Sequence, residues 1–220
     1  MIVSRNPNSY LIDMRGGYYL SKIDFKKLLN LQNRNSKKKF VIGDIKGLNR
    51  VYGIDLLLRA AAKIRETRSD IDLEVRIAGK GNEEEQLKEL AKELRLDGVI
   101  SWLGFIPQDQ VAHEWANMDV AIIPSRRESF GVSSVEAQAC GVPVIISNIP
   151  GLMETTYYEK ENIFNTGDYS DLADKIICLY DNPEKVKELG YLSNKNVKTK
   201  YELDYCFKNI ESLFNQMASN

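Results

Sequence analysis

The strongest constraint on the fold is a segment in which two short apolar runs enclose a block rich in small residues. The first run is Val120–Ile123 and the second is 142–146. Short apolar runs bounded by turn residues are typical of buried strands. Between the two runs, Gly131 comes shortly before two serines, and Gly141 is soon followed by a proline. These signals predict a loop and then a helix that starts near Gly131 and ends at Gly141.

The rest of the chain from residue 39 onward alternates between strand and helix patterns. Expected strands are 40–43, 72–78, 99–103, 120–123 and 142–146, and expected helices are 54–67, 83–95, 109–118, 170–180 and from Pro183 onward. Asn82 and Asp168 are the expected N-caps of two of these helices. The alternation predicts an α/β fold, a Rossmann-like parallel sheet with helices on both faces and extra C-terminal helices. We expect one domain over 39–220, after an N-terminal linker or remnant, 1–38.

The block around Gly131 has the composition of an anion-binding site. In an open α/β sheet, ligands bind outside the carboxyl ends of the strands, where a helix that begins there directs its amide groups at the ligand. The amides of Phe130, Gly131 and Val132 would therefore suit a phosphate. Glu136, farther along the helix, would accept hydrogen bonds from a sugar diol such as a ribose. Glu128 precedes the helix and would meet whatever lies beyond the phosphate.

The pattern E-x-F-G, followed by E-A-x-A-C-G-x-P-V-I, resembles the donor-binding half of the retaining glycosyltransferases with a GT-B fold, specifically family four, also called glycosyltransferase group 1. The resemblance runs from about residue 39 to the C-terminus. It implies transfer of a sugar from a nucleotide diphosphate with retention of configuration. It also implies that Glu128 faces the donor sugar, that Phe130, Gly131 and Val132 hold the diphosphate, and that Glu136 binds the ribose.

Residues outside this block extend the expected donor site. The family usually has a basic residue after its first strand, here Lys46, and a second six positions later, where this chain has Tyr52. Arg50 or Arg126 would supply the missing charge, and the alternative is that Lys46 and Arg50 are solvated loop charges. The resemblance also implies that the turn with Gly79 and Gly81 lines the nucleotide cleft and that Phe105 or Ile106 contacts the base, although ordinary turns would look the same.

Composition limits the other classes of function. The 220 residues carry a net charge of -1, which gives no electrostatic field for nucleic acid. No apolar run reaches the roughly 18 residues that span a bilayer, so at most a peripheral membrane association is expected. The scattered Cys140, Cys178 and Cys206 fit reduced core thiols in a cytoplasmic protein. We expect no metal centre and no cofactor besides the nucleotide-sugar substrate.

Three functions remain open at this point. The first is an enzyme, a hexosyltransferase donor domain whose N-terminal acceptor-binding half is missing here or belongs to a partner chain. The second is a module that binds sugar nucleotides without turnover, alone or as a subunit of a split enzyme. The third is a sugar-nucleotide epimerase, because such enzymes share the GT-B architecture, although the E-x-F-G context speaks against it.

Overall fold

The computed structural model describes residues 9–12, 19–21, 39–201, 207, 211–212 and 214–215 of the 220. Near the N-terminus, β1 (Ser9–Ile12) pairs antiparallel with β2 (Tyr19–Ser21). The remainder of the expected linker, 1–38, lies outside the described residues, so the domain boundary at residue 39 stays a prediction.

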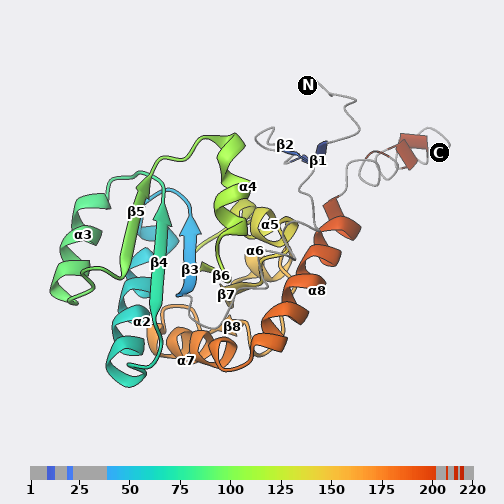
Figure 1. Ribbon diagram of the computed structural model, residues 1–220. Helices are drawn as coiled ribbons and strands as arrows, with labels where there is room; N and C mark the ends of the chain where they lie inside the picture. The colour runs from blue at the N-terminus through green and yellow to red at the C-terminus, as the bar shows by residue number, and fades with distance from the viewer. Residues whose placement is uncertain are drawn as a thin grey trace.

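A six-stranded sheet forms the centre of the molecule. Its strands are β3 (Phe40–Ile45), β4 (Leu73–Ala78), β5 (Ile100–Gly104), β6 (Val120–Ile123), β7 (Val144–Ser147) and β8 (Ile163–Phe164). They lie in the order β5-β4-β3-β6-β7-β8, and every neighbouring pair is parallel. The expected parallel, Rossmann-like sheet is confirmed (Figure 1).

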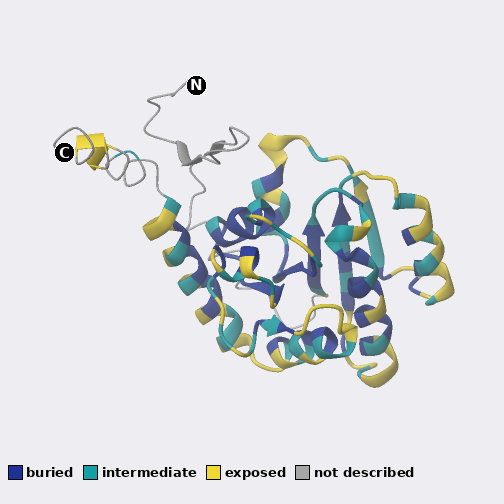
Figure 2. Ribbon diagram, turned by 180° about the vertical axis from the view of Figure 1, so that it is seen from behind, coloured by how far each residue is buried: buried dark blue, intermediate teal, exposed yellow. Residues whose placement is uncertain are grey.

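Helices cover both faces of this sheet. They are α2 (Ile54–Thr67), α3 (Glu84–Glu93), α4 (Gln108–Ala116), α5 (Val132–Ala139), α6 (Pro150–Met153), α7 (Tyr169–Tyr180) and α8 (Pro183–Tyr201), with a short 3-10 helix, η1 (Arg50–Tyr52), before α2. Figure 2 shows the strands mostly buried between these helices, whose outer surfaces are exposed. The arrangement leaves the carboxyl ends of the strands on one edge of the sheet, where the loops gather.

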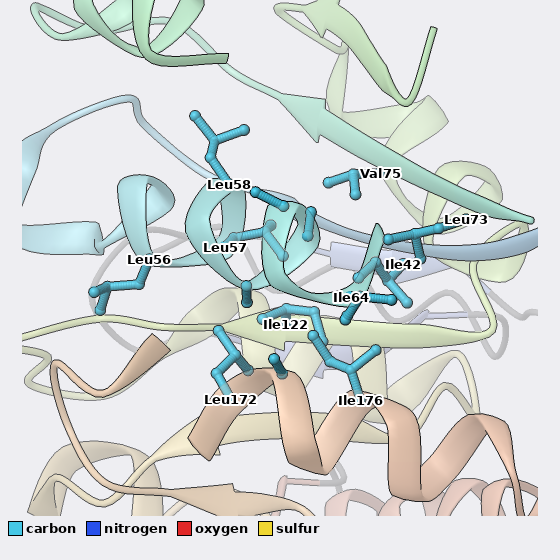
Figure 3. Close-up of a cluster of buried hydrophobic side chains, with 14 of the residues drawn as sticks. Ile42, Leu56, Leu57, Leu58, Ile64, Leu73, Val75, Ile122, Leu172 and Ile176 are labelled. Carbon is cyan, nitrogen blue, oxygen red and sulfur yellow. The ribbon is translucent and has the colours of Figure 1, made fainter. Parts of the chain in front are cut away.

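Alternating strand residues supply two separate apolar cores. On one face, Ile42 of β3 and Ile122 of β6 pack with residues of α2 and α7, and Figure 3 shows this cluster. On the other face, the neighbouring residues Val41 and Ile123 pack with α4, α5 and α6. Because successive side chains of a strand point to opposite faces, a strand buried on both sides is apolar throughout. A charged residue within such a strand is therefore conspicuous.

The structure corrects three local expectations. Strand β3 extends to Ile45, because the amide of Lys46 still donates to the Ala78 carbonyl at 2.8 Å and keeps the chain against β4. Helix α3 begins at Glu84, so Asn82 is not its N-cap. Cys178 is exposed rather than part of the core, whereas Cys140 is buried; Cys206 lies outside the described residues.

Two expected helix starts are confirmed. The Asp168 side chain accepts hydrogen bonds from the amides of Ser170 and Asp171, which caps α7. At the start of α8, the Asn182 side chain accepts from the Lys185 amide at 3.1 Å. Side-chain oxygens at these positions satisfy amides of the first turn that have no partner within the helix.

Candidate functional site

The sheet order defines where a ligand would bind. From β3 the chain crosses to β4 on one side, while β6 lies against β3 on the other side. This reversal of strand order is a topological switch point, and ligands of open α/β sheets bind in the crevice at the carboxyl ends of the strands there. Lys46 follows β3 directly and Glu128 lies in the loop after β6. The fold thus brings two predicted donor-site residues, 82 positions apart in the chain, to one place.

Lys46 and Glu128 form an ion pair that is nearly closed to solvent. The Lys46 ammonium donates to the Glu128 carboxylate, and the two side chains are 9% and 14% exposed. Lys46 also lies 3.3 Å from the Ser125 hydroxyl oxygen and 4.5 Å from the centre of the Tyr52 ring. Tyr52 therefore replaces the second cation of the family pattern with an aromatic face that the first cation contacts. An incoming phosphate would compete with Glu128 for Lys46.

Arg126 is engaged in holding two loops together. Its guanidinium donates two hydrogen bonds of 2.7 Å to the Asp55 carboxylate and one of 2.9 Å to the Arg50 carbonyl. Asp55 lies in the first turn of α2, so this bidentate pair joins the loop after β6 to the segment that follows β3. The hydrogen bonds that Arg126 donates to Asp55 raise the pKa of Arg126. Arg50 itself is exposed on η1, and its predicted contact with a ligand stays a prediction.

The start of α5 meets the end of β3. Gly131 is the N-cap, with a φ of 77°, and a Cβ atom there would lie 2.5 Å from Leu152. A residue other than glycine would be strained by this left-handed backbone as well as by the contact. Ser133, in the first turn, donates to the Ile45 carbonyl at 3.0 Å. The N-terminal end of α5, with its positive dipole and first-turn amides, therefore lies beside the end of β3 that leads into Lys46.

Phe130 and Glu136 occupy the two ends of this predicted motif. The Phe130 carbonyl accepts a hydrogen bond of 2.8 Å from Thr155, which fixes the backbone just before Gly131. Glu136 lies in the second turn of α5, is 9% exposed, and accepts a hydrogen bond of 3.3 Å from Gln108 at the start of α4. Gln108 was not predicted, because no sequence signal links a residue of α4 to one of α5.

The turns after β4 and β5 approach the same edge of the sheet. A Cβ atom on Gly79 would collide with the Lys46 carbonyl, and one on Gly81 would collide with the Leu48 carbonyl. Both glycines therefore have a structural reason to be present, and their predicted contact with a nucleotide stays a prediction. After β5, Phe105 is 69% exposed and Ile106 is partly buried against the core beneath α4.

Asp44 is a member of the site that the sequence analysis missed. It lies two residues before Lys46, is fully buried, and neither of its carboxylate oxygens has a hydrogen-bond partner in the described part of the chain. Burial raises the pKa of its carboxyl to about 7, against the opposing effect of Lys46. A lone aspartate in the apolar run of β3 was the available signal, but the expected end of the strand at Gly43 had placed it in a loop.

Two kinds of feature are absent from the described residues. No helix among them is both long and apolar enough to span a membrane. Within 39–201 and the few described residues beyond, no group of three or more His, Cys, Asp or Glu side chains is arranged to hold a metal ion.

The parallel sheet, with helices on both faces and a switch point between β3 and β6, defines an open α/β domain of the Rossmann-like type. The family described as "Glycosyl transferases group 1" matches residues 26–196. The chain therefore belongs to the glycosyltransferase group 1 family. This membership, predicted from the E-x-F-G block, is confirmed.

Individual relatives agree with this family. The chain is 34% identical over 146 residues to the D-inositol 3-phosphate glycosyltransferase of Pseudarthrobacter chlorophenolicus. The aligned region covers 65% of this chain and 35% of that protein. Sucrose-phosphate synthase from Thermosynechococcus elongatus aligns with a TM-score of 0.74 at 24% identity, over 89% of this chain and 49% of that one. Anabaena HepE, whose structure was solved with UDP and glucose, aligns with a TM-score of 0.72 at 20% identity, over 87% of this chain and 51% of that one. The fold is thus that of half a GT-B glycosyltransferase, and the chain spans about a third of the curated relative.

Proposed function

We propose that this chain binds a nucleotide-diphosphate sugar and presents it for retaining transfer of a hexose to a saccharide or lipid-linked acceptor, in the biosynthesis of a glycan or polysaccharide. The observation that carries the proposal is the Lys46–Glu128 pair at the switch point, beside the N-terminal end of α5. A cation and helix amides suit a diphosphate, and a carboxylate next to them suits a sugar hydroxyl.

Every predicted site residue except Arg126, whose guanidinium holds two loops together, has a role in this proposal. Lys46 and the amides around Gly131 hold the diphosphate and stabilise the charge that develops on it as the sugar departs. Glu128, released from Lys46, contacts the donor sugar, and Glu136 binds the ribose. Gly79 and Gly81 let the backbone approach the nucleotide, and the exposed Phe105 ring or Ile106 contacts the base. Arg50 supplies a second positive charge.

The proposal includes no metal ion or organic cofactor, so EDTA should leave nucleotide binding unchanged. It does include an acceptor-binding half, either N-terminal in the same protein or on a partner chain, because the curated relative is much longer than this chain. We also propose a cytoplasmic location with at most peripheral membrane contact. The free thiols of Cys140 and Cys178 support a reducing compartment.

A thermal-shift titration with UDP, GDP and ADP tests the proposal. Saturation at a hundredfold over the dissociation constant should add about 2.7 kcal/mol of stability, which for a domain of this size raises the melting temperature by roughly 5 to 10 °C. Glu136→Ala should remove most of this shift. Lys46→Ala should weaken binding by about 1.5 to 3 kcal/mol, roughly ten- to 150-fold in the dissociation constant.

Matched controls come from the opposite end of the molecule. Glu184 and Lys187 lie exposed on α8, with side chains 83% and 52% exposed, so Glu184→Ala and Lys187→Ala should bind nucleotide like the wild type. If none of the three nucleotides shifts the melting temperature of the wild type, the proposed function fails. If a nucleotide binds equally to the wild type and to both site variants, it binds elsewhere.

One observation favours the second candidate, a module that binds without turnover: Tyr52 occupies the position at which the family pattern has a second cation. Mixing the chain with an acceptor-binding half of the same family separates the candidates. Release of nucleoside diphosphate in the mixture identifies a transferase, and binding without release identifies the module. Conversion of the sugar nucleotide without release would identify an epimerase instead.

A further inference from the structure

Asp44 is buried in the sheet at the place where the donor site begins. It pairs in register with Ile77 of the neighbouring strand β4, and Ile77 belongs to the apolar core beneath α2. Asp44 also lies on the same face of β3 as Ile42, which packs in that core. No solvent reaches the side chain, and its oxygens make no hydrogen bond to any described residue. A carboxylate in such a place is costly when ionised, because Lys46 and the Ile45 amide offset only part of the loss of its hydration.

Two charged groups act on Asp44, Lys46 from its own strand and Glu128 from the loop after β6. Two other charged groups on adjoining elements have partners of their own. Asp55 of α2 is held by Arg126. Arg76 of β4 pairs with Glu74 and with Glu114 of α4, on the other face of the sheet. The charge immediately around Asp44 is thus set by three groups, Asp44, Lys46 and Glu128.

The charge of this cluster decides whether it accepts an anion. With Asp44 neutral, the positive charge of Lys46 and the negative charge of Glu128 cancel. With Asp44 ionised, the cluster carries a net negative charge before any ligand arrives, and both carboxylates compete with a phosphate for one ammonium group. Coulomb interactions among these groups are strong, because their side chains are buried or nearly so and water is largely excluded from around them. A diphosphate therefore favours the protonated form of Asp44.

We propose that Asp44 is a positioning residue that acts through Lys46: its carboxyl takes up a proton from solvent when a donor diphosphate binds, and the neutral carboxyl leaves Lys46 to the phosphate. This inference rests on the proposed function, because it concerns the same diphosphate site. Burial, which raises the pKa of this carboxyl to about 7, makes the proton uptake measurable near neutral pH. Above that pH, each bound diphosphate would have to draw one proton from solvent.

Isothermal titration calorimetry of the full chain with UDP, or with GDP or ADP if one of these gives the larger thermal shift, tests the inference. Titrations at about pH 8 in buffers with different ionisation enthalpies count the protons taken up. For each nucleotide bound, the wild type should take up as much as one proton more than Asp44→Asn. Above about pH 7, the dissociation constant of the wild type divided by that of Asp44→Asn should rise by up to tenfold per pH unit. The nucleotide's own titration is common to both proteins and cancels.

Asp97→Asn, a change at an exposed aspartate in the turn before β5, is the matched control and should behave like the wild type. Equal proton uptake in the wild type and in Asp44→Asn overturns the inference while leaving the proposed function intact. If neither protein binds any of the three nucleotides between about pH 5.5 and about pH 8.5, the proposed function fails, and this inference fails with it.

If Asp44→Asn does not fold, a second measurement still tests the inference. The infrared spectrum of the wild type at about pH 8 should gain the carbonyl band of a protonated carboxylic acid when UDP, GDP or ADP is added. Lys46→Ala should lose this coupling, because the phosphate then has no ammonium group through which to act. Nucleotide binding to the wild type without the band contradicts the inference.

Discussion

Asp44 should make the stability of the folded chain depend on pH. Burial raises the pKa of its carboxyl to about 7 in the folded chain, whereas an aspartate in an unfolded chain titrates near about 3.9. Between these values the folded chain holds one proton more than the unfolded chain. The free energy of unfolding therefore falls as the pH rises, by about 1.4 kcal/mol per pH unit. This contribution is fully present below about pH 4 and is lost by about pH 7, a change on the order of 4 kcal/mol.

Urea denaturation of the wild type and Asp44→Asn over this pH range measures the effect as a difference between two curves. All other titrating groups are shared, so their contributions cancel. Asp97→Asn, where the replaced carboxyl is exposed, should follow the wild type at every pH. A gap between the wild type and Asp44→Asn that stays constant from about pH 4 to about pH 7 would show that Asp44 titrates normally.

At the scale of elements, helix α5 depends on one buried amide. The Gln138 side chain donates to the carbonyls of Ser134 and Thr155, at 3.2 Å each, and accepts from the Tyr157 amide and the Asn196 side chain. Asn196 belongs to α8, so Gln138 joins α5, the segment after α6, and α8 at one point. These contacts fix the later part of α5, the helix whose N-terminal end is the proposed phosphate site.

Gln138→Leu should destabilise the chain. The change keeps the volume but leaves the Tyr157 amide without its acceptor in the interior, which costs on the order of 2 to 3 kcal/mol. The melting temperature should fall by about 4 to 12 °C for a domain of this size. Gln110→Leu, at an exposed position of α4, is the control and should change the melting temperature little. Equal melting temperatures for the two variants would mean that water replaces the Gln138 contacts.

The elements that the sequence predicted best are those whose own periodicity defines them. Helix α2 and strand β6 have the predicted bounds, 54–67 and 120–123, because their apolar spacing and adjacent turn residues, such as Gly53 and Pro124, lie within or beside the segment itself. The end of β3 was predicted too early, because the polar residue Asp44 is typical of a loop. What extends the strand to Ile45 is a hydrogen bond to β4, a segment far away in the chain. Local patterns carry no information on such a partner.

The same distinction applies to the site as a whole. The E-x-F-G block is contiguous, so its two glutamates and Gly131 could be placed on a loop and a helix from the sequence. The pairing of Glu128 with Lys46 and that of Arg126 with Asp55 exist only because β3 and β6 are neighbours in the sheet. Strand order is set by packing of the whole domain. The sequence therefore indicated Lys46, Arg126 and Glu128 as site residues. It did not indicate that Glu128 pairs with Lys46, or that Asp55 holds Arg126.

The Arg126–Asp55 pair connects the two halves of the sheet across the switch point, which leads to a whole-molecule prediction. Asp55 belongs to the half with β3, β4 and β5, and Arg126 to the half with β6, β7 and β8. A double-mutant cycle with Arg126→Ala and Asp55→Ala should give a coupling free energy of about 1 kcal/mol in urea denaturation, because the pair is bidentate and partly buried. The exposed Lys187–Glu184 pair, three residues apart on α8, should give only about 0.3 kcal/mol.

Nucleotide affinity in the same four proteins decides what Arg126 does. If Arg126 only fixes the two loops, Arg126→Ala and Asp55→Ala should weaken binding to a similar extent, and the double variant should be no weaker than either, because each change opens the same contact. If Arg126 holds the diphosphate directly, as the sequence predicted, Arg126→Ala should weaken binding far more than Asp55→Ala. Asp55→Ala should then leave binding unchanged or strengthen it, because it frees the guanidinium for the phosphate. The two outcomes differ in sign for Asp55→Ala, so one titration separates them.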